Sequence, residues 1–184
     1  MPITQNSELS PELSPELSPE QSPELCPEEL CPCGKQTSQG ALAYQQCCQP
    51  YHRGQAAPDA ETLMRSRYSA FVLREHDYLI STHDSDYLNG LTKGLLDSDN
   101  HTHWIGLDVN DFQETGDTAV VEFHAWYLDD GLTAIHEISQ FHKRNGRWLY
   151  TTGEQRPPEM PSRNLPCPCK SGKKFKQCCL SRKA

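Results

Sequence analysis

Two cysteine-rich blocks, one near each end of the chain, constrain the fold more than any other feature of the sequence. Both read CPC, then a loop, then an aromatic residue, two further residues and CC, over residues 31–48 and 167–179. Neither block has enough apolar residues for a hydrophobic core of its own. Each block therefore needs a cross-link between its thiols in order to fold. The blocks are internal repeats of each other and indicate the same kind of site twice.

Zinc is the cross-link that this pattern favours. Four cysteines in two close pairs can wrap a tetrahedral Zn²⁺, whose bonds of ~2.3 Å to sulfur require the chain to return to one point. Disulfides are disfavoured because the chain reads as cytoplasmic, with neither a signal peptide nor a membrane span. A dithiol oxidoreductase is expected to carry C-x-x-C at the start of a helix, which neither block has. Adjacent cysteines could form a strained vicinal disulfide, but two metals explain both repeats more simply.

The C-terminal block, CPCKSGKKFKQCC, contains the parts of a small metal knuckle. Ser171 and Gly172 are suited to turn the chain, and the run from Lys173 can form a helical turn that presents the last two cysteines. Phe175 is expected to be its hydrophobic plug. The surrounding lysines would lower the pKa values of the thiols and offset the negative charge of a Cys₄ zinc site.

Charge is distributed unevenly along the chain. The net charge is −8, yet residues 1–30 carry seven Glu and no base, whereas residues 162–184 carry seven Lys or Arg and no acid. Within residues 1–25, Ser-Pro-Glu-Leu repeats place a proline at every fourth position, which prevents a continuous helix, and the glutamates repel one another. This segment is therefore predicted to be a flexible acidic tail.

The chain between the blocks is predicted to form an α+β domain over 55–156. Apolar spacing indicates a helix over 60–74, with Asp59 as its N-cap, and a second helix over 76–82. From Trp104 onward the apolar period becomes two, in four segments separated by the turn signals ETGD, DDG and NG, which indicates an antiparallel meander. The predicted segments are the tail over 1–25, a cysteine block over 26–54, this domain, a Pro-rich linker over 157–165 and the second block over 166–184.

At these residues the sequence resembles two known families. CPCKSGKKFKQCC resembles the SEC-C motif, whose ligands are the two Cys of C-x-C, a third Cys eight residues later and an adjacent His or Cys. The resemblance implies the zinc ligands Cys167, Cys169, Cys178 and Cys179. The whole arrangement, with LMRSRYSAFVLREHDYLISTH, VEFHAWY and HEISQFHKRNGRW, resembles the YchJ-like proteins. This second resemblance implies a cone-shaped middle domain like nuclear transport factor 2, with helices on a curved antiparallel sheet, and no particular activity.

The N-terminal block departs from the SEC-C pattern, because thirteen residues rather than eight separate its second and third cysteines. The extra residues fall between the cysteine pairs, where a loop can absorb them. The ligands implied for this block are Cys31, Cys33, Cys47 and Cys48, with His52 as the alternative to the last of them. Cys26, in the acidic segment, is expected to be a free thiol. The chain would thus hold one or two zinc ions.

Cone-shaped folds of this kind often enclose a pocket between helices and sheet. The apolar set expected to face inward from VVEFHAWY is Val121, Phe123, Ala125 and Tyr127. On the following strand Glu137 belongs to one alternating set, and His136 and His142 belong to the other. If the first set faces inward, Glu137 is a candidate general base.

Arg65 or Arg67 on the first helix could pair with Glu137, either at a catalytic site or, more simply, as a buried pair that orients helix on sheet. His83, His101 and His103 stand in polar, turn-like sequence and are expected at the surface. No nucleotide-binding loop or nucleophile elbow is present.

These observations favour a cytoplasmic, non-catalytic zinc-binding protein whose SEC-C knuckles bind a partner. The SEC-C motif also occurs at the C-terminus of the Sec preprotein translocase ATPase, where it contacts an acidic chaperone surface. By analogy with that knuckle, the resemblance implies that an acidic protein could bind the lysines of the second block, which are Lys170, Lys173, Lys174 and Lys176. Nucleic acid, the ribosome or anionic lipid are alternative partners. The alternative function is a small-molecule enzyme or ligand carrier that uses the pocket of the cone. The oligomeric state is left open by the sequence.

Overall fold

The structure, a computed structural model, describes residues 29–98 and 101–181. The acidic tail predicted over 1–25 and the thiol of Cys26 lie outside the described residues. Within the described ranges, no helix is long and apolar enough to cross a membrane.

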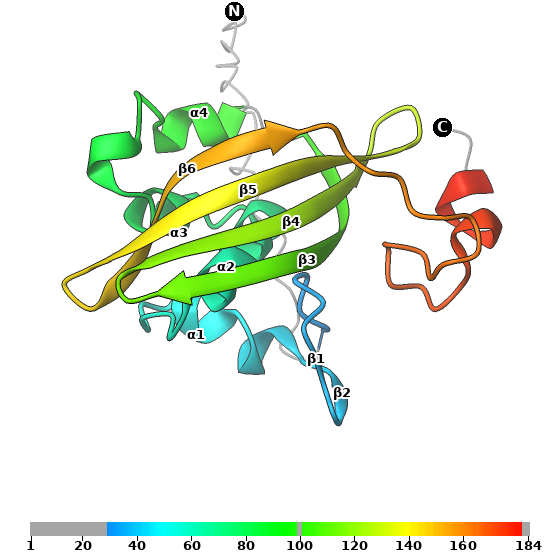
Figure 1. Ribbon diagram of the computed structural model, residues 1–184, viewed down its shortest axis with the longest axis horizontal. Helices are drawn as coiled ribbons and strands as arrows, with labels where there is room; N and C mark the ends of the chain where they lie inside the picture. Colours follow the sequence, from blue (N-terminus) through cyan, green and yellow to red (C-terminus); the bar gives the residue numbers. More distant parts are fainter. Residues whose placement is uncertain (1–28, 99–100, 182–184) are drawn as a thin grey trace, which may run out of the picture.

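A four-stranded antiparallel sheet forms the centre of the fold (Figure 1). Its strands are β3 (His103–Thr115), β4 (Thr118–Leu128), β5 (Leu132–Arg144) and β6 (Arg147–Arg156). They pair in chain order, so the predicted meander is confirmed. Two of the connections have only two residues, and in one of them, Asn145–Gly146, both residues have positive φ, of 54° and 76°. This is the conformation that a two-residue Asn-Gly hairpin turn requires.

The sheet is irregular at three points, where an extra residue shifts the register. The extra residues are Ile105, between Trp104 and Gly106, and Asn110, between Val109 and Asp111, both on β3, and Thr151 on β6, opposite Gln140 and Phe141 of β5. Bulges of this kind bend a strand and increase its twist. The curved sheet expected for a cone-shaped α+β domain is therefore present.

Helices cover one face of this sheet (Figure 1). The main helix, α2 (Ala60–Leu73), begins where Asp59 accepts a hydrogen bond from the amide of Thr62 at 2.6 Å, and α3 (His76–Ser81) follows. Both helices and the Asp59 cap agree with the prediction. The first helix ends at Arg74, whose left-handed backbone (φ 61°) turns the chain into α3.

The main core lies between these helices and the inner face of the sheet. Leu63 and Leu79 from the helices are each 1 % exposed, and Val121 from β4 is fully buried. Phe123 and Ala125 also face inward, as the alternation along β4 predicts. Burial of these side chains contributes the largest share of the stability, at roughly 1.5–3 kcal/mol for each large one.

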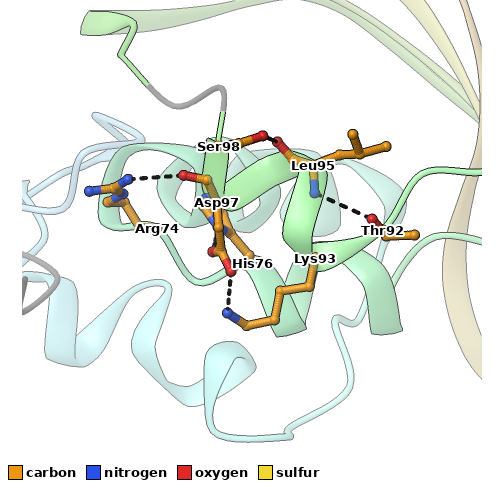
Figure 2. A network of polar contacts seen from close by, with 7 residues as sticks. All are labelled: Arg74, His76, Thr92, Lys93, Leu95, Asp97 and Ser98. Atoms are coloured by element: carbon orange, nitrogen blue, oxygen red, sulfur yellow. Dashed lines mark hydrogen bonds and ion pairs between the residues drawn. The ribbon is translucent and has the colours of Figure 1, made fainter. Parts of the chain in front are cut away.

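Several short elements were not predicted. They are β1 (Gln36–Thr37), β2 (Gly40–Ala41), α1 (Gln49–His52), α4 (Lys93–Ser98) and the 3₁₀ turns Tyr44–Gln46, Ser85–Tyr87 and Cys179–Ser181. The 3₁₀ turn Phe175–Gln177, by contrast, is the helical turn predicted after Lys173. Figure 2 shows why α4 forms: Thr92 caps it through the amide of Leu95, and Asp97 contacts His76 at 2.5 Å and Lys93 at 2.8 Å.

The outer face of the sheet is partly covered by the chain that follows β6. His124 and His136 stack on this face with ring centroids 4.1 Å apart, and Trp126 stacks on His124. The carbonyl of Pro157 lies 3.1 Å from His136 Nδ1, and the amide of Glu159 donates to His124 Nε2 at 3.4 Å. Residues 157–159 therefore lie along the sheet and lead to the C-terminal block.

Two candidate metal centres

The N-terminal block brings its four cysteine sulfurs to within 4.8 Å of one another. Cys31 and Cys33 stand in a tight turn that is closed by a hydrogen bond from the amide of Gly34 to the carbonyl of Cys31. The 3₁₀ turn before Cys47 presents the second pair, and the sulfurs of Cys33 and Cys47 are 3.5 Å apart. All four side chains are buried, so this cluster is part of the main core.

The C-terminal block gathers its four sulfurs within the same distance of one another. Cys169 lies 3.4 Å from Cys167 and 3.5 Å from Cys178, measured between sulfur atoms. Phe175 is 2 % exposed and packs with these cysteines and with Ile105 and Leu132 of the sheet. This small core is separate from the main one, and Phe175 is its plug, as the sequence predicts.

The two blocks share one pattern of backbone hydrogen bonds. In the first, the amide of Cys31 donates to Leu42 and that of Tyr44 donates to Glu29; in the second, the amide of Cys167 donates to Lys173 and that of Phe175 donates to Leu165. The turn after each CPC and the 3₁₀ turn before each CC also have equivalent bonds. The internal repeat seen in the sequence is therefore a repeat of local structure.

The additional residues of the N-terminal block lie in a small hairpin outside this shared pattern. Strands β1 and β2 pair Gln36 with Ala41 and Thr37 with Gly40, and the hydroxyl of Thr37 donates to the carbonyl of Gly40 at 3.0 Å. The hairpin returns the chain to Leu42, at the position that Lys173 takes in the other block. The longer loop thus leaves the two cysteine pairs of the N-terminal block in the same relative arrangement as those of the C-terminal block.

His52 does not take the place of a cysteine ligand. Its Nδ1 lies 2.7 Å from the hydroxyl of Tyr44, and its Nε2 lies 2.9 Å from the carbonyl of Ser66. With both ring nitrogens engaged, His52 supports the cluster from outside, and the alternative ligand proposed from the sequence is wrong. Tyr44 is itself the counterpart of Phe175, so this histidine orients the plug of the N-terminal block.

Both clusters suit a tetrahedral ion that prefers sulfur. Four sulfurs at ~2.3 Å from one ion lie about 3.8 Å apart, which agrees with the spacings in both blocks. All eight cysteines in the described part of the chain are free thiols. Although burial opposes it, hydrogen bonds from Ser171 and the neighbouring thiols lower the pKa of Cys169 to about 6. In the other cluster, hydrogen bonds from Cys33 and its neighbours lower the pKa of Cys31.

The C-terminal knuckle is attached to β3 by packing and by charge. Gly106 faces the carbonyl of Pro168 so closely that a Cβ at position 106 would lie 2.2 Å from that oxygen. Lys170, next to the cluster, forms an ion pair with Asp108, and Asp108 also accepts a hydrogen bond from Trp126 at 2.8 Å. Lys170 is therefore engaged within the protein, whereas Lys173, Lys174 and Lys176 are exposed.

Glu137 and Arg67 line a cavity between helix α2 and the inner face of the sheet. The pairing of Arg65 with Glu137 considered from the sequence is absent: Arg65 instead binds Glu61 at 2.7 Å and the carbonyl of Cys33 at 3.4 Å. His83 was expected at the surface, but it lines the cavity, because β6 holds it through a bridge to Tyr150. His101 and His103 are exposed, as expected.

Comparison with known families agrees with this arrangement. The family model described as the YchJ middle NTF2-like domain matches residues 59–153, and the SEC-C motif matches residues 163–181. A UPF0225 protein of Shewanella sp. strain MR-4 is 48 % identical over 164 residues, which cover 83 % of this chain and 97 % of that protein. A second UPF0225 protein, from Shewanella sp. strain MR-7, is 46 % identical with the same coverage.

Two solved structures are similar in fold. The crystal structure of a SEC-C motif protein from Psychrobacter arcticus has a TM-score of 0.62 and 34 % identity, covering 83 % of this chain and 96 % of that one. The solution structure of a SEC-C motif protein from Rhodopseudomonas palustris has a TM-score of 0.61 and 32 % identity, covering 68 % and 98 %. The chain therefore belongs to the UPF0225, or YchJ-like, family, with an NTF2-like middle domain and a C-terminal SEC-C motif.

Proposed function

We propose that this protein binds two zinc ions, one in each Cys₄ cluster, and uses the knuckles so formed to bind a partner in the cytoplasm. The observation that carries the proposal is the repeated backbone pattern that gathers four free thiols at each end of the domain. Free thiols in such number suit a reducing compartment.

The zinc ions would be structural rather than catalytic. A catalytic zinc keeps one coordination position for water or substrate, whereas four protein sulfurs close the coordination sphere. In the N-terminal cluster Cys33 is fully buried and Cys48 is 1 % exposed, so a substrate has no approach to an ion there. This burial supports a non-catalytic role for the metal.

In this proposal, the exposed lysines of the C-terminal knuckle form the surface that contacts the partner. Lys173, Lys174 and Lys176 lie beside Arg163, whose carbonyl accepts the amide of Lys176 at 3.0 Å. An acidic protein surface matches this charge. Nucleic acid is the weaker candidate, because Phe175 is buried as the plug and offers no face on which a base could stack.

Metal content per chain tests the zinc proposal. Elemental analysis of protein purified under reducing conditions is expected to give two zinc ions per chain. The variant Cys31→Ser with Cys33→Ser and the variant Cys178→Ser with Cys179→Ser are each expected to keep one. A wild-type protein without zinc, or variants that keep both ions, would contradict the proposal.

Affinity capture at low and high salt tests the partner. The tagged protein is expected to retain an acidic protein at low salt and release it at high salt. The variant Lys173→Glu with Lys174→Glu is expected to lose that partner. A matched control, Arg53→Glu with Arg147→Glu, changes the net charge equally at exposed positions away from the knuckle. Equal retention by both variants would count against the lysine surface.

A further inference from the structure

A cavity of about 260 Å³ lies inside the NTF2-like domain, away from both cysteine clusters. Its walls are mainly aromatic and aliphatic, and include Tyr68, Phe71, Trp104, Phe123, Ile135 and Tyr150. Ligand pockets for drug-sized molecules span about 300–1,000 Å³, so this volume suits a smaller compound. A few polar side chains, Arg67, His83, Glu137 and Ser139, also reach the cavity.

Arg67 is a buried cation that forms no ion pair with a carboxylate of residues 29–98 or 101–181, although the negative charge of Glu137 in the same cavity acts on it from beyond contact distance. One of its nitrogens donates to the carbonyl of Leu79 at 2.8 Å and to the hydroxyl of Thr82 at 2.7 Å, and its guanidinium lies 4.8 Å from the ring centre of Tyr150. Among the residues that the structure describes, the arginines in ion pairs are Arg65, Arg144 and Arg156. Burial lowers the pKa of Arg67 to about 10, which leaves it charged at neutral pH.

Glu137 is occupied by other donors. The hydroxyls of Ser139 and Tyr150 donate to it at 2.5 and 3.3 Å, and the side-chain amide of Gln155 binds its second oxygen. Its carboxylate lies directly against Gly153, where a Cβ would be 2.2 Å from the carboxylate carbon. Glu137 is thereby held in place, and the buried Arg–Glu pair considered from the sequence is not formed.

The cavity is also lined by buried polar groups that have no hydrogen-bond partner among the described residues, namely the indole N–H of Trp104 and the ring nitrogens of His83. Trp104 lines it, and the indole N–H of this residue is buried with no acceptor within reach in residues 29–98 and 101–181. Burial, followed by the charge of Arg67, lowers the pKa of His83, so this ring is neutral and does not add a second positive charge. A ligand that brings an anionic acceptor would satisfy both Arg67 and Trp104.

The rim of the cavity is formed in part by the segment that leads into α4. Leu91 lines the cavity, and α4 is held beside it by the contact of Asp97 with His76 from α3 (Figure 2). Arg74 also donates to the carbonyl of Asp97 at 3.4 Å. These contacts fix the wall at that end, so the cavity is preorganised.

We infer that the cavity binds a small aromatic monocarboxylate, with its carboxylate on the guanidinium of Arg67 and its ring among the aromatic walls. The charge of this guanidinium, which has no ion pair among the described residues, selects the carboxylate, and the volume limits the ligand to about one ring. This binding site is separate from the metal centres, and nothing in it requires a chemical step. It goes beyond the proposed function, because it assigns a ligand to the middle domain.

The test is a titration of the full-length, zinc-loaded protein followed by ¹H–¹⁵N NMR. The probes are benzoate and phenylacetate, and their neutral counterparts benzamide and phenylacetamide serve as controls. The carboxylates are expected to give saturable shifts at the indole N–H of Trp104 and not at that of Trp148. The amides are expected to bind at least about tenfold more weakly, because they lack the negative charge that would pair with the guanidinium of Arg67.

Two variants and one control localise the site. Arg67→Lys keeps the charge but loses the planar donor pair, and it is expected to weaken carboxylate binding about tenfold. Arg65→Gln, two residues away on α2 and outside the cavity, is expected to leave it within about twofold. If Arg67→Lys fails to fold, Ala125→Leu provides the test instead. Its larger side chain fills the cavity without changing the charge of Arg67, and it is expected to abolish binding.

The inference is overturned if no probe binds up to about 10 mM, a very weak affinity, or if the amides bind as well as the carboxylates. It is also overturned if binding survives Ala125→Leu. Zinc content, measured on the same samples, separates this result from the proposed function: the metal can be present while the cavity binds nothing.

Discussion

Gly106 of β3 and Pro168 of the C-terminal knuckle are in direct backbone contact, since a Cβ at position 106 would lie 2.2 Å from the proline carbonyl oxygen. The glycine is needed here for space, because its φ is not positive. Lys170 and Asp108 add an ion pair beside this contact. The knuckle is thus fitted to the edge of the sheet and does not hang from a free linker.

Gly106→Ala is expected to detach the knuckle while leaving the NTF2-like domain folded. The added methyl group cannot be accommodated against a backbone carbonyl, so the knuckle has to move. Hydrogen exchange of residues 157–170 is expected to speed up by at least about tenfold. The matched control is Gly94→Ala in α4, where the nearest atom is 3.9 Å away and a helical alanine should be neutral or stabilising by about 0.5–1 kcal/mol. Unchanged exchange in Gly106→Ala would show that the contact does not hold the knuckle.

Loss of the two metal centres is expected to have unequal effects on stability. The N-terminal cluster is part of the main core, whereas the C-terminal cluster belongs to a small core with Phe175. Cys33→Ser is expected to lower the main melting temperature by about 10 °C or more, and Cys169→Ser by only a few degrees. Differential scanning calorimetry gives both values. Equal shifts in the two variants would mean that both knuckles contribute alike to the core.

The β1–β2 hairpin is expected to be dispensable for metal binding. Replacing residues 35–41 by Ser-Gly would give the N-terminal block the loop length of its C-terminal copy, while Cys31, Leu42 and Tyr44 keep their shared hydrogen bonds. Shortening a loop changes the closure entropy by only about 0.6 kcal/mol for each halving of its length. The zinc content measured by elemental analysis should therefore stay the same. A variant that folds but holds one zinc fewer would show that the hairpin helps to form the site.

The pKa values of the two stacked histidines on the outer face, His124 and His136, are expected to be shifted in opposite directions from the usual 6.5. Burial lowers the pKa of His124, and the positive charge of His136 lowers it further, below the usual 6.5. His136 is also buried, but the carbonyl of Pro157 and the carboxylate of Glu122, 2.7 Å away, raise its pKa above 6.5. NMR titration of the ring protons measures both values. A lower pKa for His136 than for His124 would contradict this assignment.

This difference gives the attachment of residues 157–159 a predicted pH dependence. Because the pKa of His136 is raised in the folded state, its contribution is fully present below 6.5 and is lost as the pH rises through the folded-state value. Protease sensitivity of the linker should thus increase as the pH rises above 6.5, through the raised pKa of His136. In His136→Gln the increase should disappear. A linker that becomes more sensitive on acidification would reverse the sign and reject the role of His136.

The parts of the fold that the sequence predicted are those with a local cause. Period-two alternation and the Asn-Gly turn predicted the sheet, and Asp59 predicted the start of α2. Helix α4 has no such signal: none of its residues is buried, and it depends on the contact of Asp97 with His76 from α3. A tertiary contact of this kind is not visible in a short window of sequence.

In the candidate sites, too, the features with a local cause in the sequence were predicted, and those that depend on tertiary contacts were not. The repeated cysteine pairs were visible because the sequence repeats, and the structure brings all eight predicted ligands into two clusters. Arg65 and Arg67 could not be told apart, since they lie two residues apart on opposite sides of a helix that is buried on most of its surface. His83 looked like a loop residue, and only its bridge to Tyr150 carries it into the cavity.

The most direct test of the two Cys₄ zinc centres is zinc K-edge X-ray absorption of the purified full-length protein. We predict a first shell of four sulfur atoms at about 2.3 Å for both ions, without a histidine contribution. The same shell is expected in each single-site variant, at half the zinc content. Nitrogen or oxygen in the first shell, or a protein whose cysteines are joined in disulfides and hold no zinc, would contradict the account.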